Sequence, residues 1–241
     1  MGALAKKRIE AEETFLFPDS LPLIAKRNNR ARRVALRLDV RARNFILVIP
    51  KGMSDKKAFD FARAQKKWMI EKSAALPSRI TFDNGQSVPV KGIMHELDIA
   101  YIPERKTTHI FFENEKICIK SAIRDPSLRI KRFLKHEALK QLEALSHEKA
   151  GIIGCRVSKV SVRDPKSRWG SCSPNGNISY SWRLIFAPYQ VMDYIVAHEV
   201  AHLKHLDHSP AFWRVCQSLS EDYELGRHWI RDNPAELMRY G

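Results

Sequence analysis

The sequence predicts a mixed α+β protein, and two kinds of pattern support that prediction. The first half contains several short runs in which apolar and polar residues alternate, which is typical of half-buried strands. The second half contains apolar residues spaced three and four positions apart, which is the period of a helix with one buried face. Of the 241 residues, 44% are hydrophobic, so the chain has enough apolar material for a packed core.

The N-terminal part is expected to be a polar tail over residues 1–20, followed by a β-rich region with helices over residues 21–150. Two strands, at residues 35–40 and 44–50, flank a tight basic turn at residues 41–43 and predict a hairpin.

Two helices are predicted in the same region. One covers residues 55–75, with Ser54 or Asp55 as its N-cap, and the other covers residues 127–149. Between them, apolar runs separated by turn residues predict four short strands, over residues 86–91, 95–102, 109–113 and 116–121. No repeat or low-complexity linker marks a boundary, and we assign residues 151–241 to a separate metal-binding region because of the motif described next.

A candidate metal site lies in the stretch His198-Glu199-Val200-Ala201-His202, which has the pattern H-E-x-x-H. On a helix, His198 and His202 share one face, so both rings can reach an ion about 2.0 to 2.1 Å away. Glu199 lies beside that point and can act as a general base toward a water molecule activated by the metal. The pattern also occurs by chance in helices that bind nothing. The flanking sequence favours a helix, because Pro188 suits a first turn and apolar residues recur at helical spacing after it.

A catalytic zinc ion normally has three protein ligands, so a third ligand is needed. We expect it to be His208, because Ser209 and Pro210 predict the N-cap and first residue of a new helix directly after it. That arrangement places His208 on a short, stiff corner.

Three other residues compete with His208. His205 shares the helix face of His198 but lies about 10 Å further along the axis, which suits a supporting or substrate-facing role better. Glu221 and Glu224 are the alternatives if the third ligand comes from a later helix.

The segment HEVAHLKHLDHSPAFW, preceded by SRWGSCSPNGNISYSWRLIFAP and DYIVAHE, resembles the YgjP-like family of small bacterial zinc-peptidase-like proteins, which is related to the SprT-like and WLM groups. The resemblance is specific over about residues 157–213. It implies that His198, His202 and His208 bind zinc and that Glu199 is the base. It also implies a zincin-like, small gluzincin-like fold in which the metal helix packs against a small, mostly antiparallel sheet.

Two strands, at residues 156–162 and 177–185, precede the metal helix. In zinc peptidases of this plan, the strand before the active helix can pair with an extended substrate through its backbone. Arg168 lies on the loop between the strands, where it can bind a substrate carboxylate or phosphate, or form a structural ion pair.

The chain is strongly basic, with a formal net charge of +15. Residues 26–43 contain eight lysines and arginines and a single acid, Asp39. This charge predicts nucleic acid or a phosphorylated ligand as a partner, unless the basic residues only cover solvated faces. The sequence has no apolar run long enough to span a membrane and no signal-peptide core, so we expect a cytoplasmic protein without membrane contact.

Three functions follow from these observations. The first is a zinc-dependent hydrolase of peptidase type that acts on peptides or proteins. The second is a metal-dependent hydrolase of nucleotide phosphoanhydrides, a nucleoside triphosphate pyrophosphatase, which would use the basic surface to hold phosphates. The third is a nucleic-acid-binding protein with a structural metal, which would require a fourth protein ligand.

Overall fold

The computed structural model describes residues 12–17 and 21–241, and the chain divides into two compact units, Met1–Pro77 and Ser78–Gly241. This division differs from the one we expected after residue 150. The part of the chain between residues 78 and 150 shares one hydrophobic core with the region after residue 150, within the second unit. Of the expected polar tail, residues 1–11 and 18–20 lie outside the described residues, whereas residues 12–17 form a strand.

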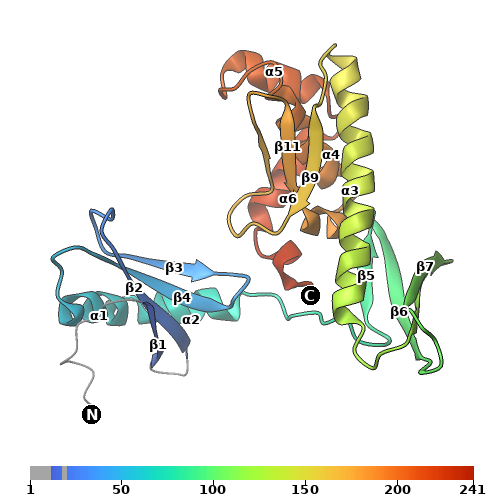
Figure 1. The fold of residues 1–241 in the computed structure, drawn as a ribbon. Helices are drawn as coiled ribbons and strands as arrows, with labels where there is room; N and C mark the ends of the chain where they lie inside the picture. Colours follow the sequence, from blue (N-terminus) through green and yellow to red (C-terminus); the bar gives the residue numbers. More distant parts are fainter. Residues whose placement is uncertain (1–11, 18–20) are drawn as a thin grey trace. The chain divides into compact units, whose positions relative to one another are not determined.

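The first unit is a four-stranded sheet with two helices (Figure 1). Its elements are β1 (Glu12–Phe17), β2 (Leu21–Asn28), β3 (Ala35–Asp39), β4 (Asn44–Pro50), α1 (Asp55–Ala64) and α2 (Lys66–Ala74). The strand order is β1-β2-β4-β3, with β2 and β4 parallel and the other pairs antiparallel. The core contains apolar side chains of the sheet and both helices, including Leu23, Phe45, Leu47, Ala58 and Met69.

The predicted hairpin corresponds to β3 and β4, whose register pairs Asp39 with Asn44. The single helix expected over residues 55–75 is instead two helices. They meet at Gln65, whose ψ of 10° departs from helical geometry. Ser54 is the N-cap of α1, since its side chain accepts a hydrogen bond from the Lys57 amide.

The second unit begins with a sheet of four strands, which the alternating pattern predicted to within two residues at each end. They are β5 (Ser87–Val90), β6 (Ile93–Tyr101), β7 (His109–Glu113) and β8 (Lys116–Ser121). Their order is β5-β6-β8-β7, and β6 and β8 are parallel.

A long helix, α3 (Ser127–Ile152), connects this sheet to a smaller one. The smaller sheet consists of β9 (Lys159–Arg163), β10 (Gly170–Cys172) and β11 (Asn177–Ser181), in the order β10-β11-β9. Figure 1 shows α3 running beside β9. The pair β10–β11 is antiparallel, whereas β11–β9 is parallel. This sheet is therefore mixed, not mostly antiparallel as expected.

The strand expected over residues 177–185 ends at Ser181. A 3-10 helix, η1 (Trp182–Phe186), replaces its second half, and all five of its side chains are buried. Ser181 begins this helix, because its hydroxyl accepts a hydrogen bond from the Arg183 amide.

The remaining elements are helical: α4 (Tyr189–Ala201), α5 (Pro210–Ser218), α6 (Tyr223–Asp232) and the 3-10 helix η2 (Glu236–Arg239). Helix α4 packs against α3, α5, α6 and β10, so it lies at the centre of the unit. None of the helices in the described part of the chain is long and apolar enough to cross a membrane.

Candidate metal centre

Helix α4 carries the first four residues of the H-E-x-x-H pattern and ends at Ala201, and His202 is its C-cap. The side chains before the motif, such as Val196 and Ala197, are fully buried, which fixes the rotation of the helix. With that rotation, His198 and His202 lie on one face with ring centroids 5.1 Å apart. The four-residue spacing of His198 and His202 thus places the two imidazole rings side by side.

His208 lies on the connection between α4 and α5. Ser209 is the N-cap of α5, accepting a hydrogen bond from the Phe212 amide, and Pro210 is the first helical residue, as the sequence predicted. This corner brings Nε2 of His208 to 3.2 Å from Nε2 of His198. One ligand atom from each of His198, His202 and His208 lies within 4.8 Å of the others.

The three histidines suit a divalent metal with a preference for nitrogen ligands. Two nitrogens bound tetrahedrally to one zinc ion lie about 3.3 Å apart, close to the observed distance between His198 and His208. His202 donates from Nδ1 to the His205 carbonyl at 2.9 Å, which leaves its Nε2 lone pair available for a metal. Burial and the neighbouring histidines lower the pKa of His198 to about 4, so its ring is neutral at pH 7 and able to act as a ligand. Its own Nδ1 is buried without a described hydrogen-bond partner.

The competing ligands do not join this group. His205 contributes its backbone carbonyl and not its ring. Glu224 pairs with His228 and Arg227 on the exposed face of α6, and Glu221 lines a separate cavity. Within residues 12–17 and 21–241, no fourth histidine, cysteine, aspartate or glutamate completes a closed metal site.

Glu199 is 6% exposed and follows His198 directly in α4. Burial raises the pKa of its carboxyl to about 7, and the charge of Arg168 opposes that rise. The backbone of Gly170, the first residue of β10, packs directly on this side chain. The first residue of β10 therefore lies against Glu199, whereas a role for Arg168 in substrate binding stays a prediction. Arg168 itself is exposed, and no ion pair to it occurs among the residues that the structure describes.

Two aromatic residues complete the surroundings of the histidines. Phe212 lies 4.5 Å from the His202 ring and 4.7 Å from the His208 ring, and Trp213 lies 5.5 Å from His208, all between ring centroids. Phe212 is fully buried, and the sequence indicated no functional role for Phe212, Trp213 or Gly170. The position of Phe212 and Trp213 in the first turn after the N-cap Ser209 was the one sequence feature that could have placed these two rings near His208.

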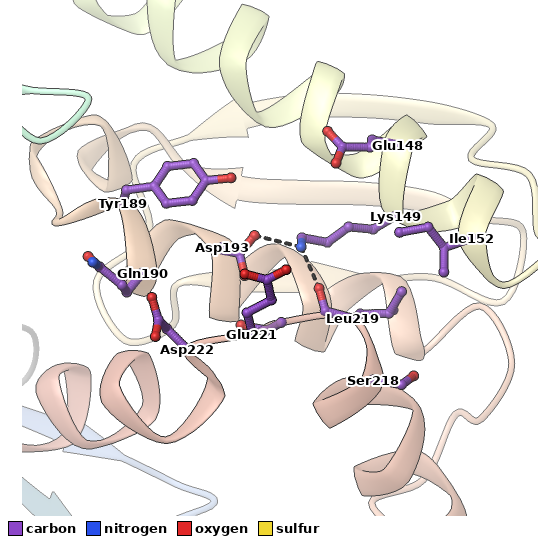
Figure 2. A pocket seen from close by; sticks show the side chains of 11 residues that line it. Glu148, Lys149, Ile152, Tyr189, Gln190, Asp193, Ser218, Leu219, Glu221 and Asp222 are labelled. Carbon is purple, nitrogen blue, oxygen red and sulfur yellow. Dashed lines mark hydrogen bonds and ion pairs between the residues drawn. The ribbon is translucent and has the colours of Figure 1, made fainter.

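A cavity of about 290 Å³ is lined by residues of α3, α4, the end of α5 and the connection to α6 (Figure 2). Lys149 of α3 pairs there with Asp193 of α4 at 2.5 Å and donates to the Leu219 carbonyl, as the dashed lines show. Both charged side chains are buried. This ion pair ties α3 to the helix that carries His198 and His202.

The chain is similar to known metallopeptidases. A family model described as "YgjP-like, metallopeptidase domain" matches residues 34–233. A similar solved structure is the crystal structure of the metallopeptidase zymogen of Pyrococcus abyssi abylysin. The two sequences are 26% identical over an alignment that covers 38% of this chain and 93% of the abylysin chain. The TM-score between the two structures is 0.35. No curated protein matches the chain. Because the family model spans most of the sequence and includes all three histidines and Glu199, the chain belongs to the YgjP-like metallopeptidase family.

Proposed function

We propose that this protein is a zinc-dependent peptidase in which His198, His202 and His208 hold the metal and Glu199 is the general base. One observation carries the proposal: three histidine nitrogens lie within 4.8 Å of one another, and the residue directly after the first of these histidines is a buried glutamate. In this assignment, α4 and the sheet β10-β11-β9 form a zincin-like arrangement, and the contact between α4 and β10 supports it.

The chemistry requires a group that takes a proton at neutral pH. A bound zinc ion would act as a Lewis acid, polarising the substrate carbonyl and making a water molecule more acidic. Glu199 accepts the proton and later delivers it to the leaving amine. Burial raises the pKa of the Glu199 carboxyl in the metal-free protein, and the positive charge of a bound zinc ion would lower it again, which favours the carboxylate form that accepts the proton. Gly170 keeps the carboxylate in place from the other side.

The substrate is proposed to bind as an extended chain along β10. Among the described strands, β10 pairs with β11 alone and is an edge strand of the three-stranded sheet, so its outer backbone groups face no other strand of that sheet. An extended peptide can add to such an edge. We expected the last strand before α4 to pair with the substrate. That strand is β11, which is already paired with a strand on each side, so we propose β10 in its place. Arg168, two residues before β10, is suited to bind a substrate carboxylate.

The number of ligands favours catalysis over a structural metal. Structural zinc sites have four protein ligands, whereas catalytic sites have three and an open position. The described residues offer three, and His208 is exposed to solvent. These features argue against the structural-metal alternative.

The test compares zinc-loaded wild type with Glu199→Gln on two kinds of substrate. One arm uses a mixture of internally quenched peptides and a denatured protein, and the other measures phosphate and pyrophosphate release from nucleoside triphosphates. We expect peptide cleavage that is at least about 100-fold slower in Glu199→Gln, with equal zinc content, because the amide cannot accept a proton. Triphosphate hydrolysis that depends on zinc and Glu199, without peptide cleavage, would establish the phosphoanhydride alternative instead.

A further inference from the structure

The first unit carries a hollow of about 620 Å³ beside the β2–β3 connection, and arginines dominate its lining. It is formed by Asn28 at the end of β2, the residues of the connection, the start of β3, and Val48 of β4. Four guanidinium groups line it, from Arg30, Arg32, Arg33 and Arg37.

These four arginines differ from the arginines that stabilise the same unit. Arg27 pairs with Asp55 and donates to the Met53 carbonyl, and Arg43 donates to the Pro77 carbonyl. By contrast, all four arginines of the hollow are exposed, and within the described part of the chain none of them forms an ion pair. Four like charges gathered around one hollow repel one another, and an anion bound among them relieves that repulsion.

The connection that carries the arginines has a defined turn. The Asn28 side chain accepts a hydrogen bond from the Arg30 amide at 2.9 Å, and the Asn28 carbonyl accepts one from the Ala31 amide at 3.1 Å. Arg37 follows on β3, which is an edge strand of the sheet. The guanidinium groups are therefore presented from an ordered turn and an adjoining strand.

The chemistry of the hollow favours phosphate groups over nucleobases. A guanidinium binds two phosphate oxygens at once with two parallel hydrogen bonds. None of the described residues that line the hollow is aromatic, so these residues offer no platform on which bases can stack.

The exposure of the arginines favours a polymer over a single small anion. A small ligand is normally bound in a pocket that buries most of its surface, whereas these side chains all lie in solvent. Each strand of a DNA duplex carries one phosphate about every 3.4 Å along the helix axis, so nucleic acid can contact several exposed cations together. We propose that the hollow lined by Arg30, Arg32, Arg33 and Arg37 binds the phosphodiester backbone of nucleic acid without reading its sequence. This inference goes beyond the peptidase proposal and does not depend on it.

The experiment measures binding of the full-length protein to a short fluorescent DNA duplex, and to RNA and single strands, by anisotropy between about 50 and 200 mM salt. The test variant replaces all four arginines with glutamine. The control removes the same charge from four exposed lysines of α1 and α2, namely Lys56, Lys57, Lys67 and Lys72. Circular dichroism and zinc content verify that both variants are folded.

We expect wild type to bind, and the arginine variant to bind at least about tenfold more weakly. Its salt slope should be lower by about 0.9 for each duplex phosphate that the variant no longer neutralises. The lysine variant should keep its affinity to within about threefold, because salt screens exposed charges outside the binding surface.

The proposal is wrong if wild type does not bind at about 50 mM salt, or if both variants bind more weakly to the same extent. It is also wrong if inorganic tripolyphosphate or a nucleoside triphosphate displaces the duplex at micromolar concentration, since the ligand would then be a small anion.

Discussion

A Cβ atom built on Gly170 would overlap Oε1 of Glu199 and lie 2.5 Å from its Cγ. No side chain can occupy that space while Glu199 stays where it is. Gly170 does not have a positive φ, so glycine is required at this position for space and not for backbone conformation. The edge strand β10 therefore sets the position of the proposed general base from outside the metal helix.

Gly170→Ala should remove catalysis while leaving the metal site intact. The methyl group displaces the Glu199 carboxylate, and a displacement of about 1 Å can lower the rate about 100-fold. Turnover and zinc content are measured on the same preparation. Gly151→Ala is the matched control, because its Cβ meets nothing within 4 Å and its φ is not positive, so activity should be unchanged. Full activity in Gly170→Ala would show that Glu199 does not need its present position.

In the metal-free protein, Glu199→Gln should be more stable than wild type at high pH. Burial raises the pKa of Glu199 from its ordinary value of 4.5 to about 7, so the folded protein holds this proton more tightly than the unfolded chain does. The stabilising effect of that proton is present below pH 4.5 and is lost as the pH rises to 7. The glutamine side chain does not ionise, so the advantage of the variant should grow over this window to about 3 kcal/mol at most and then stay constant.

Urea denaturation at several pH values measures this difference. Both proteins carry the same histidines, so the comparison isolates the carboxyl group. If the difference in unfolding free energy between Glu199→Gln and wild type does not change between pH 4.5 and 7, burial does not destabilise the ionised carboxylate of Glu199.

His208→Ala should bind zinc at least about 100-fold more weakly, while Glu221→Ala and Glu224→Ala should bind it as tightly as wild type. His208 is exposed, so its removal should leave the free energy of unfolding of the metal-free protein nearly unchanged. Competition with a fluorescent chelator measures the three affinities. Tight zinc binding by His208→Ala, together with loss in either glutamate variant, would assign the third ligand to α6 or the turn before it.

Lys149→Met should destabilise the fold by roughly 3 kcal/mol, because it leaves Asp193 buried without its partner. Adding Asp193→Asn removes the unpaired charge and should restore part of that stability. Chemical denaturation of the two variants and wild type measures both effects. A destabilisation below about 1 kcal/mol for Lys149→Met would mean that water in the neighbouring cavity solvates Asp193 adequately.

The parts of the site that depend on local spacing were predictable from the sequence. The i, i+4 pair His198 and His202, and the cap Ser209 that positions His208, follow from helix geometry within about ten residues. The hairpin β3–β4 and the strands β5 to β8 were predictable for the same reason, because alternation and turn residues are local signals.

The parts that depend on distant contacts were not predictable. β10 is three residues long, Gly-Ser-Cys, and has no alternation to identify it. The contact between Gly170 and Glu199 joins positions in two different elements. The strand predicted from Asn177 extended to residue 185, four residues beyond the end of β11. The side chains of η1 are buried and mostly apolar, so the sequence pattern does not distinguish them from a buried strand. The unit boundary at Pro77 was not predicted. Helix α3 packs against α4 and so belongs to the same unit, and a contact between two distant helices leaves no signal in the local spacing of apolar residues.

The central claim is that three histidines form an open zinc site, and X-ray diffraction at the zinc absorption edge from crystals of the zinc-loaded protein tests it most directly. We predict one anomalous peak per chain, with nitrogens of His198, His202 and His208 at about 2.0 to 2.1 Å and solvent in the fourth position. A peak elsewhere, or a fourth side chain bound to the ion, would contradict the account.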